Sequence, residues 1–271
     1  MGFGFEHIRK RAYGVEGILM VTPTELKRIA VKDGVPQAVV EKDLALSVAL
    51  KTIAHSELGK RIVFKGGTAI RKVYFKEARF SEDLDFNAIG ISRNECLKLL
   101  KEELENKSID GVGFGKVEEE KTTAGLKAAV KYIGPLAYEQ RIRFDFSFRE
   151  NLAQTPVRKP LIDAYGVGNA QINVLSIEEI FAEKLHALGS RSAPRDVYDA
   201  WFLFEHGVGI DKNVLVKKFE YYGEKFDVGK ALANARKGEG NWKRDLRHLV
   251  RNLPDFITIE REVERKLRQL S

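Results

Sequence analysis

Residues 62–86 of the chain read IVFKGGTAIRKVYFKEARFSEDLDF, and this stretch decides the fold that we expect. It begins with a short apolar run typical of a strand, passes through a glycine pair into a helix, and ends in a second strand-like run. Glycines at a strand-to-helix turn let the backbone approach an anion closely, and N–H groups at a helix start favour phosphate. We therefore expect Gly66, Gly67 and Thr68 to bind phosphate groups, with Ser81 lining the loop before the second strand.

Two carboxylates, Asp83 and Asp85, open the second strand. Side chains at positions i and i+2 of a strand project from the same face, so this pair brings two negative charges together. Like charges at short distance are unfavourable, and a divalent cation that prefers oxygen ligands, Mg²⁺ or Mn²⁺, removes this cost. We expect the pair to bind the catalytic metal ions, with Leu84 and Phe86 in the core. The alternative is an exposed strand end with solvated carboxylates.

A third carboxylate, Asp145, lies in the strand-like run RIRFDFSFRE at residues 141–150. The run alternates between an apolar face, with Ile142, Phe144, Phe146 and Phe148, and a polar face, with Arg141, Arg143, Asp145 and Ser147. Three carboxylates on adjacent strands beside a glycine turn are typical of two-metal phosphoryl transfer. We expect Asp145 to complete the metal site and to accept the proton of an attacking hydroxyl. Arg141 and Arg143 are expected to guide a phosphate toward the metals.

The sequence after residue 176 predicts helices. Ser176 and Glu179 are spaced as a capping box at the start of IEEIFAEKLHALGS, and Gly189 is expected to end that helix. Pro194 suits the first turn of the next helix, PRDVYDAWFLFEHG. Pro254 is expected to separate the last two helices of the chain.

Three charged residues of this helical part are candidate site residues. A lysine that faces a cleft neutralises triphosphate charge, so Lys184 is expected to steady an NTP, together with Arg191. Asp196 is expected to orient one of these cations and to serve in catalysis. The alternatives are a surface lysine beside a core helix and an aspartate that complements a helix dipole.

Together these motifs resemble a known enzyme family. FKGGTAIRKVY followed by RFSEDLDF resembles the first motif of the polymerase-β-type nucleotidyltransferases. The fuller pattern, with Glu183-Lys184 and Arg191…Arg195-Asp196-Val197-Tyr198-Asp199, resembles the AbiEii/AbiGii-type nucleotidyltransferase toxins. The resemblance implies a minimal nucleotidyltransferase core joined to a helical domain. It also implies transfer of a nucleoside monophosphate from an NTP with Mg²⁺, an antitoxin partner and, in some members, modification of tRNA ends.

The pattern of predicted elements divides the chain into three zones. Residues 1–59 form a helical lead-in, with helices near residues 24–32 and 36–55, packed on the core. Residues 60–175 alternate strands and helices and form the nucleotidyltransferase core, and residues 176–271 form an all-helical C-terminal domain. The fold class is therefore α/β (α+β) with a mixed sheet.

The composition of the chain indicates which kinds of molecule it binds. The chain has 271 residues, a formal net charge of +7 and a pI near 9.3, which favours a polyanionic partner such as RNA. The basic segment NARKGEGNWKRDLRHLVR, residues 234–251, is either a solvated helix face or a surface that holds an RNA backbone. Trp242 and Tyr198 are candidates for base stacking, although a core position is the favoured alternative for Tyr198. The single cysteine, Cys96, excludes an internal disulfide and is expected to be a buried apolar group. Without a signal core or a membrane-spanning run, we expect a cytoplasmic protein with no membrane contact.

These observations predict a Mg²⁺-dependent nucleotidyltransferase that acts on RNA, with the tRNA 3′ end as first candidate. One alternative is transfer to a protein side chain. Transfer to a cationic antibiotic is disfavoured by the basic composition, because such a drug needs an acidic pocket. A non-catalytic nucleic-acid-binding protein on the same fold is disfavoured because Asp83, Asp85, Gly66 and Gly67 are all present.

Overall fold

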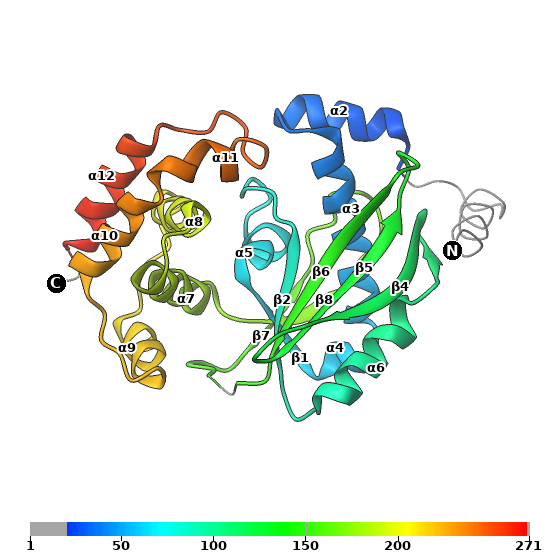
Figure 1. Ribbon diagram of the computed structural model, residues 1–271, viewed down its shortest axis with the longest axis horizontal. Coiled ribbons are helices and arrows are strands. Elements are labelled where there is room, and N and C mark those ends of the chain that lie inside the picture. The colour runs from blue at the N-terminus through cyan, green and yellow to red at the C-terminus, as the bar shows by residue number, and fades with distance from the viewer. Residues whose placement is uncertain (1–20, 150, 270–271) are drawn as a thin grey trace. The chain divides into compact units, whose positions relative to one another are not determined.

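The computed structural model describes residues 21–149 and 151–269, and these fall into two compact units (Figure 1). The first unit contains residues 21–149 and Val157–Val174. The second contains Asn151–Pro156 and residues 175–269. The first 20 residues of the expected helical lead-in lie outside the described residues.

An eight-stranded mixed sheet forms the centre of the first unit as described, with strand order β3-β4-β5-β6-β2-β1-β8-β7. Neighbouring strands are antiparallel except for two parallel pairs, β2 with β6 and β1 with β8. The strands are β1 (Ile62–Lys65), β2 (Asp83–Ala88), β3 (Ser108–Ile109), β4 (Val112–Glu120), β5 (Leu126–Ile133), β6 (Glu139–Ser147), β7 (Val157–Pro160) and β8 (Gln171–Val174). The predicted mixed sheet is therefore confirmed, and β2 lies between β1 and β6 in its interior.

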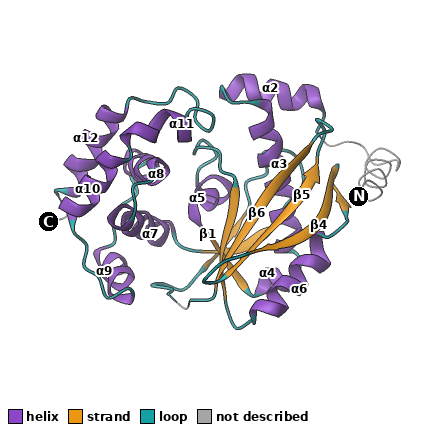
Figure 2. Cartoon of the chain, viewed as in Figure 1, coloured by secondary structure: helices purple, strands orange, loops and turns teal. Residues whose placement is uncertain are grey.

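Helices of the first unit cover one face of this sheet (Figure 2). Helices α3 (Gln37–Ala54), α4 (Glu57–Lys60) and α6 (Arg93–Leu104) contact one another and the strands. Helix α2 (Pro23–Asp33) packs on α3. The alternation predicted for β6 is present, because Ile142, Phe144 and Phe146 are buried. The strand ends at Ser147, so Phe148 lies beyond it and is half-buried.

The turn after β1 is tighter than the sequence suggested. We expected a loop through the glycine pair and then a helix, but α5 (Gly66–Ala69) begins directly after β1. Gly66 has a φ of +76°, a left-handed conformation that glycine adopts without steric cost and that reverses the chain within one residue. A five-residue π-helix, η1 (Ile70–Tyr74), continues from α5 without a break.

The second unit is helical in its described part. Its helices are α7 (Ile177–Ser190), α8 (Pro194–Glu205), α9 (Lys212–Tyr221), α10 (Val228–Lys237), the 3₁₀ turn η2 (Glu239–Asn241), α11 (Trp242–Leu246) and α12 (Phe256–Leu267). Pro194 opens α8 as predicted, and Pro254 lies between the last two helices.

Two details of α7 differ from the prediction. Ser176 caps the helix by accepting from the Glu179 backbone N–H at 3.1 Å, but the Glu179 carboxylate accepts from Ala153 N and Gln154 N. The capping box is therefore half formed, because the glutamate instead binds the segment that precedes the helices. Gly189 lies inside α7, which ends one residue later.

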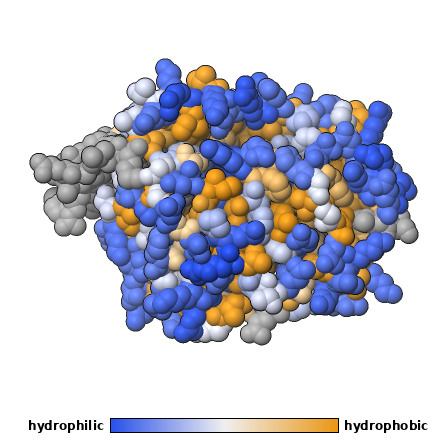
Figure 3. Space-filling view, turned by 180° about the vertical axis from the view of Figure 1, so that it is seen from behind, coloured by the Kyte–Doolittle hydropathy of each residue, from blue (hydrophilic) through white to orange (hydrophobic). Residues whose placement is uncertain are grey.

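Two further expectations concern the single cysteine and membrane-spanning helices. Cys96 is fully buried in α6, and burial raises the pKa of its thiol to about 12, as expected for an apolar group. Within residues 21–149 and 151–269, no helix is both long and apolar enough to cross a membrane. Figure 3 shows hydrophilic side chains spread over the face in view, with hydrophobic residues between them.

Candidate functional site

The aspartates of β2 lie on the sheet face opposite the buried side chains of the strand. Leu84 and Phe86 are fully buried, as expected, whereas Asp83 and Asp85 alternate with them and are partly accessible. Because β2 pairs with β6 in parallel, Asp85 lies directly beside Asp145 in the register. The structure therefore brings two of the three predicted carboxylates next to each other on adjacent strands.

Two lysines flank the aspartate pair in the same cross-strand row. Lys65 of β1 is the register partner of Asp85 on one side, and Lys127 of β5 is the register partner of Asp145 on the other. The Lys127 Nζ atom lies 3.3 Å from Asp145 Oδ2. Like charges that face each other across strands are unfavourable, and a flanking cation reduces that cost. The row therefore reads lysine, aspartate, aspartate, lysine across four strands.

The ion pair with Lys127 involves one of the three expected metal ligands, Asp145. We expected Asp83, Asp85 and Asp145 to gather as three metal ligands. In the described part of the chain, however, no three Asp, Glu, His or Cys side chains are grouped closely enough to hold a metal ion. Lys127 was not among the predicted site residues, although the alternation of LKAAVKYI placed it on the polar face.

The glycine turn lies against the carboxylate pair. A Cβ atom placed on Gly66 would lie 2.3 Å from Asp85 Oδ2, well inside van der Waals contact, so only glycine leaves this carboxylate its position. The Thr68 hydroxyl donates to the Asp83 backbone carbonyl at 2.5 Å, and Thr68 itself is buried. Ser81, two residues before Asp83, is also buried. The predicted phosphate-binding and metal-binding residues of this unit therefore form one local constellation.

The arginines on the polar face of β6 are engaged elsewhere. Arg141 Nη2 lies 3.0 Å from Glu120 Oε1 and 3.5 Å from Glu118 Oε2, and Arg143 Nε lies 3.4 Å from Glu120 Oε1. Both side chains reach across β5 to the acidic end of β4. Glutamates therefore compensate their charge, and the expectation that these arginines guide a phosphate stays a prediction.

The second unit contains its own buried ion cluster. Lys184 Nζ lies 2.7 Å from Asp199 Oδ2 and 3.1 Å from Asp196 Oδ1, and Arg191 Nε lies 2.7 Å from Asp196 Oδ2. Burial raises the pKa of Asp196, but Lys184 and Arg191 outweigh it and hold that pKa below its usual value. The predicted cations of this unit, Lys184 and Arg191, therefore both contact the predicted carboxylate Asp196.

Asp199 is the residue of this cluster that sequence reasoning did not select. It follows Asp196 by three positions, which places both carboxylates on one face of α8, and that spacing was the available signal. The expected roles of Lys184, Arg191 and Asp196 in NTP binding stay predictions.

The aromatic residues considered for base stacking are buried. Trp242 is 3% exposed, its indole N–H donates to the Pro254 carbonyl at 3.0 Å, and its ring packs edge-on against Phe256. Tyr198 is 6% exposed and lies beside the Trp242 ring. Neither ring presents a free face to a nucleotide, so both belong to the core of the second unit.

Comparisons with known proteins agree with the geometry. The family described as "Nucleotidyl transferase AbiEii toxin, Type IV TA system" matches residues 48–269. No curated protein matches the chain.

Several solved structures are similar to this chain, and two of them illustrate the range. The nucleotidyltransferase toxin MenT4 of Mycobacterium tuberculosis is 22% identical with a TM-score of 0.72, over 91% of this chain and 88% of that one. An antigenic nucleotidyltransferase-like protein of Paracoccidioides brasiliensis is 17% identical with a TM-score of 0.44, over 78% of this chain and 94% of that one. The first similarity shows that the two proteins share the fold.

Replacing Gly66 with Ala tests the contact between the turn and the carboxylate. We expect Gly66→Ala to weaken binding of Mg²⁺–NTP by about tenfold or more, because the new Cβ displaces the Asp85 carboxylate. Titration calorimetry measures this affinity.

Gly90→Ala is the matched control, because Gly90 has a φ of +60° and open space around its Cβ position. Both variants are expected to lose about 1–2 kcal/mol of unfolding free energy from the left-handed backbone alone. Equal nucleotide affinity in the two variants would show that the close approach to Asp85 has no role in binding.

Replacing Lys184 with Met tests the buried cluster of the second unit. The change leaves Asp196 and Asp199 without their shared cation, and breaking a buried ion pair from one side costs about 3–5 kcal/mol. We expect the free energy of unfolding, measured by urea titration at neutral pH, to fall by about that amount.

Low pH should remove the stability that the Asp196 carboxylate contributes. Because the pKa of Asp196 is lower in the folded protein than its ordinary value of 3.8, this contribution is present above pH 3.8 and is lost as the pH falls through the folded-state pKa. Lys217→Met, at an exposed lysine of α9, is the control and is expected to change stability by less than about 0.5 kcal/mol. A loss for Lys184→Met no larger than that of the control would contradict the assignment.

Proposed function

Because the chain belongs to the AbiEii family of nucleotidyl transferase toxins of type IV toxin–antitoxin systems, we propose that it transfers a nucleoside monophosphate from an NTP to a hydroxyl of RNA. The 3′ end of a tRNA is the first candidate acceptor. The observation that supports this proposal is the local constellation of Gly66, Thr68, Asp83, Asp85 and Asp145 on one side of the sheet.

Asp83 and Asp85 are the residues that would hold Mg²⁺ or Mn²⁺. Their carboxylates offer the hard oxygen ligands that these ions prefer, and they project from the same face of β2. Gly66 fits this role, since its lack of a side chain leaves room for the Asp85 carboxylate. When bound, the ion would supply positive charge that offsets the negative charge of the carboxylates and the triphosphate.

The glycine turn and the third carboxylate have separate roles in the proposal. Gly66, Gly67 and Thr68 bind the phosphates through backbone N–H groups, and Ser81 lines the loop that leads to Asp83. The acceptor hydroxyl oxygen forms a bond to the α-phosphorus of the NTP, while the bond from that phosphorus to the pyrophosphate oxygen breaks. The hydroxyl proton passes to the carboxylate of Asp145, and pyrophosphate leaves.

An exposed basic surface of the second unit is the proposed contact for the RNA backbone. It consists of the exposed residues Lys237, Lys243, Arg244, Arg247 and Arg251, from the end of α10 to the segment after α11. Arg244 also forms an ion pair with Asp245. Since Trp242 and Tyr198 are buried, this surface offers charge rather than stacking. Contacts of this kind bind the backbone with little dependence on base sequence.

Incubation with each α-labelled NTP, Mg²⁺ and total RNA tests the proposed reaction. We expect label on RNA of tRNA size with the wild-type chain, and none with Asp83→Asn or Asp85→Asn, because the amide removes the charge that holds the metal. Gel separation measures the label, and circular dichroism checks that both variants stay folded. Unchanged labelling in both variants would contradict the assigned site, and label on protein rather than RNA would contradict the acceptor.

Charge reversal on the basic surface tests the RNA contact. We expect Lys243→Glu, Arg244→Glu and Arg247→Glu together to reduce RNA labelling and to leave NTP affinity unchanged, because phosphate contacts are lost. RNA affinity of the wild type should fall steeply between about 50 and 200 mM salt, and the triple variant should show a shallower slope. Filter binding at several salt concentrations measures both.

A triple change of equal charge elsewhere in the same unit, Lys217→Glu, Lys225→Glu and Lys230→Glu, is the control. The same loss of RNA labelling in both triple variants would show that net charge, and not this surface, determines RNA binding.

A further inference from the structure

A buried carboxylate in α3, Asp43, lies at the centre of an ion cluster in the first unit. It is 1% exposed, and its Oδ2 atom lies 2.7 Å from Lys72 Nζ. Arg71 Nε lies 3.5 Å from Oδ1, and the hydroxyl of Tyr165 donates to Oδ2 at 2.7 Å. Asp43 therefore lies between two buried cations that are consecutive in the sequence, and Asp33 lies 4.0 Å from Nη2 of Arg71 as a second carboxylate.

The charges of this cluster depend on one another. Burial raises the pKa of Asp43, but Lys72 and Arg71 outweigh it and lower that pKa overall. Burial lowers the pKa of Lys72 to about 8, although Asp43 opposes the change. The Asp43 carboxylate therefore favours the charged form of Lys72 against the effect of burial.

Arg71 connects the cluster to the loop before β2. Its Nη1 atom donates to the Lys76 carbonyl at 2.8 Å and to the Ala78 carbonyl at 2.5 Å. Its guanidinium carbon lies 3.7 Å from the centroid of the Phe80 ring. These contacts fix the loop that ends immediately before the carboxylates of β2, whose first residue is Asp83.

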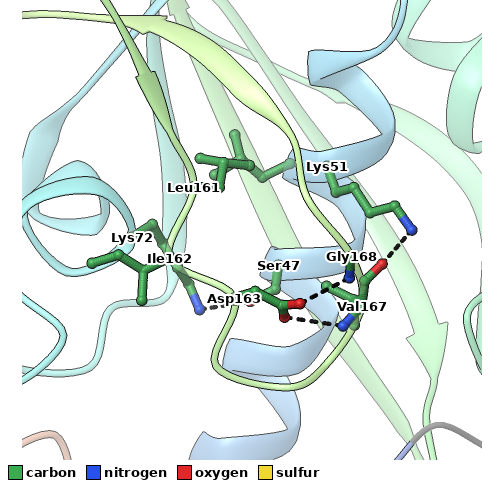
Figure 4. A pocket seen from close by; sticks show the side chains of 9 residues that line it. Ser47, Lys51, Lys72, Leu161, Ile162, Asp163, Val167 and Gly168 are labelled. Carbon is green, nitrogen blue, oxygen red and sulfur yellow. Dashed lines mark hydrogen bonds between the residues drawn. The ribbon is translucent and has the colours of Figure 1, made fainter.

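Lys72 connects the cluster to α3 and to the loop before β8. Its Nζ atom donates to Ser47 Oγ at 2.7 Å, and its carbonyl accepts from Ile162 N at 2.7 Å. Figure 4 shows Lys72 reaching Ser47, and shows Asp163 accepting from backbone N–H groups of its own loop. That loop also carries Tyr165, which returns to the Asp43 carboxylate.

Both cations lie in the π-helix η1. Helices of this kind are rare and occur frequently at functional sites. Since η1 continues directly from α5, its position also sets the turn at Gly66. The cluster is therefore connected to both parts of the proposed site. Through η1 it continues from the glycine turn, and through Arg71 it contacts the loop that leads to the carboxylate pair.

We propose that Asp43 is a positioning residue for the nucleotide-transfer site: through Arg71 it holds the loop that leads into Asp83 and Asp85. This inference rests on the proposed function for its catalytic consequence, whereas its structural part can be measured without nucleotide. The spacing of Asp43, Ser47 and Lys51, every four residues along an apolar helix, was the sequence feature that could have indicated it.

The experiment compares Arg71→Lys with Ser47→Ala. Arg71→Lys keeps a cation near Asp43 but removes the guanidinium that binds the loop carbonyls and stacks on Phe80. Ser47→Ala removes a hydrogen bond on the Lys72 side and leaves the loop contacts intact. Asp43→Asn is less informative, because it leaves two buried cations without their carboxylate and endangers folding.

Hydrogen exchange of the metal-free and nucleotide-free protein is the first readout. We expect the peptide covering residues 75–82 to exchange faster in Arg71→Lys and at the wild-type rate in Ser47→Ala. The second readout is the kinetics of nucleotide transfer. We expect kcat to fall about 10- to 100-fold in Arg71→Lys, with KM for the NTP changed by less than about threefold, because misplaced groups slow the reaction more than they weaken binding.

The outcomes separate this inference from the proposed function. Unchanged exchange of residues 75–82 in Arg71→Lys overturns the inference, whatever the activity. Equal losses of kcat in Arg71→Lys and Ser47→Ala, in proportion to their losses of unfolding free energy, also overturn it, since the cluster would then be only structural. If the wild type transfers no nucleotide, the proposed function fails, and faster exchange in Arg71→Lys alone still supports the structural link.

Discussion

Two like charges on neighbouring strands are the constraint on which the rest of this site depends. The parallel pairing of β2 with β6 places Asp85 beside Asp145, in the interior of the sheet and on its polar face. Such a pair is unfavourable unless positive charge lies close to it. The protein supplies part of that charge at the two ends of the row, from Lys65 and Lys127, and we propose that a divalent cation supplies more when it binds. The same constraint explains why the neighbouring turn begins with glycine, because any side chain there would displace the Asp85 carboxylate.

Much of this arrangement could be predicted from local sequence. Alternation placed Leu84 and Phe86 in the core and Asp83 and Asp85 on the opposite face, because strand periodicity depends only on the strand itself. The strand order and register could not be predicted, since the partner of a strand is set by contacts distant in sequence. For that reason the ion pair of Lys127 with Asp145 was missed. The ion pairs of Arg141 and Arg143 could not be predicted for the same reason, because their glutamate partners are on β4.

Buried ion clusters recur in both units, around Asp43 in the first and around Lys184 in the second. A buried ion pair contributes little net stability, because desolvation opposes the attraction between the charges, but removing one partner is costly. Such clusters therefore specify a geometry more than they increase stability. In the first unit the cluster includes Arg71 and Lys72, which follow the glycine turn, and in the second it joins α7 to α8. We propose that buried charges hold the parts of the nucleotidyltransferase in place and that the partly accessible carboxylates of β2 take part in its chemistry.

The central claim is that the β2 carboxylates bind a divalent cation, and Mn²⁺ binding tests it most directly. Free Mn²⁺ gives a strong paramagnetic resonance signal that disappears on binding, so a titration of the nucleotide-free protein counts bound ions and gives their affinity. The account predicts saturable binding by the wild-type chain that is lost when Asp83 and Asp85 are both replaced by Asn, with an unchanged far-ultraviolet circular dichroism spectrum. Equal Mn²⁺ binding by the wild type and the double variant would contradict it.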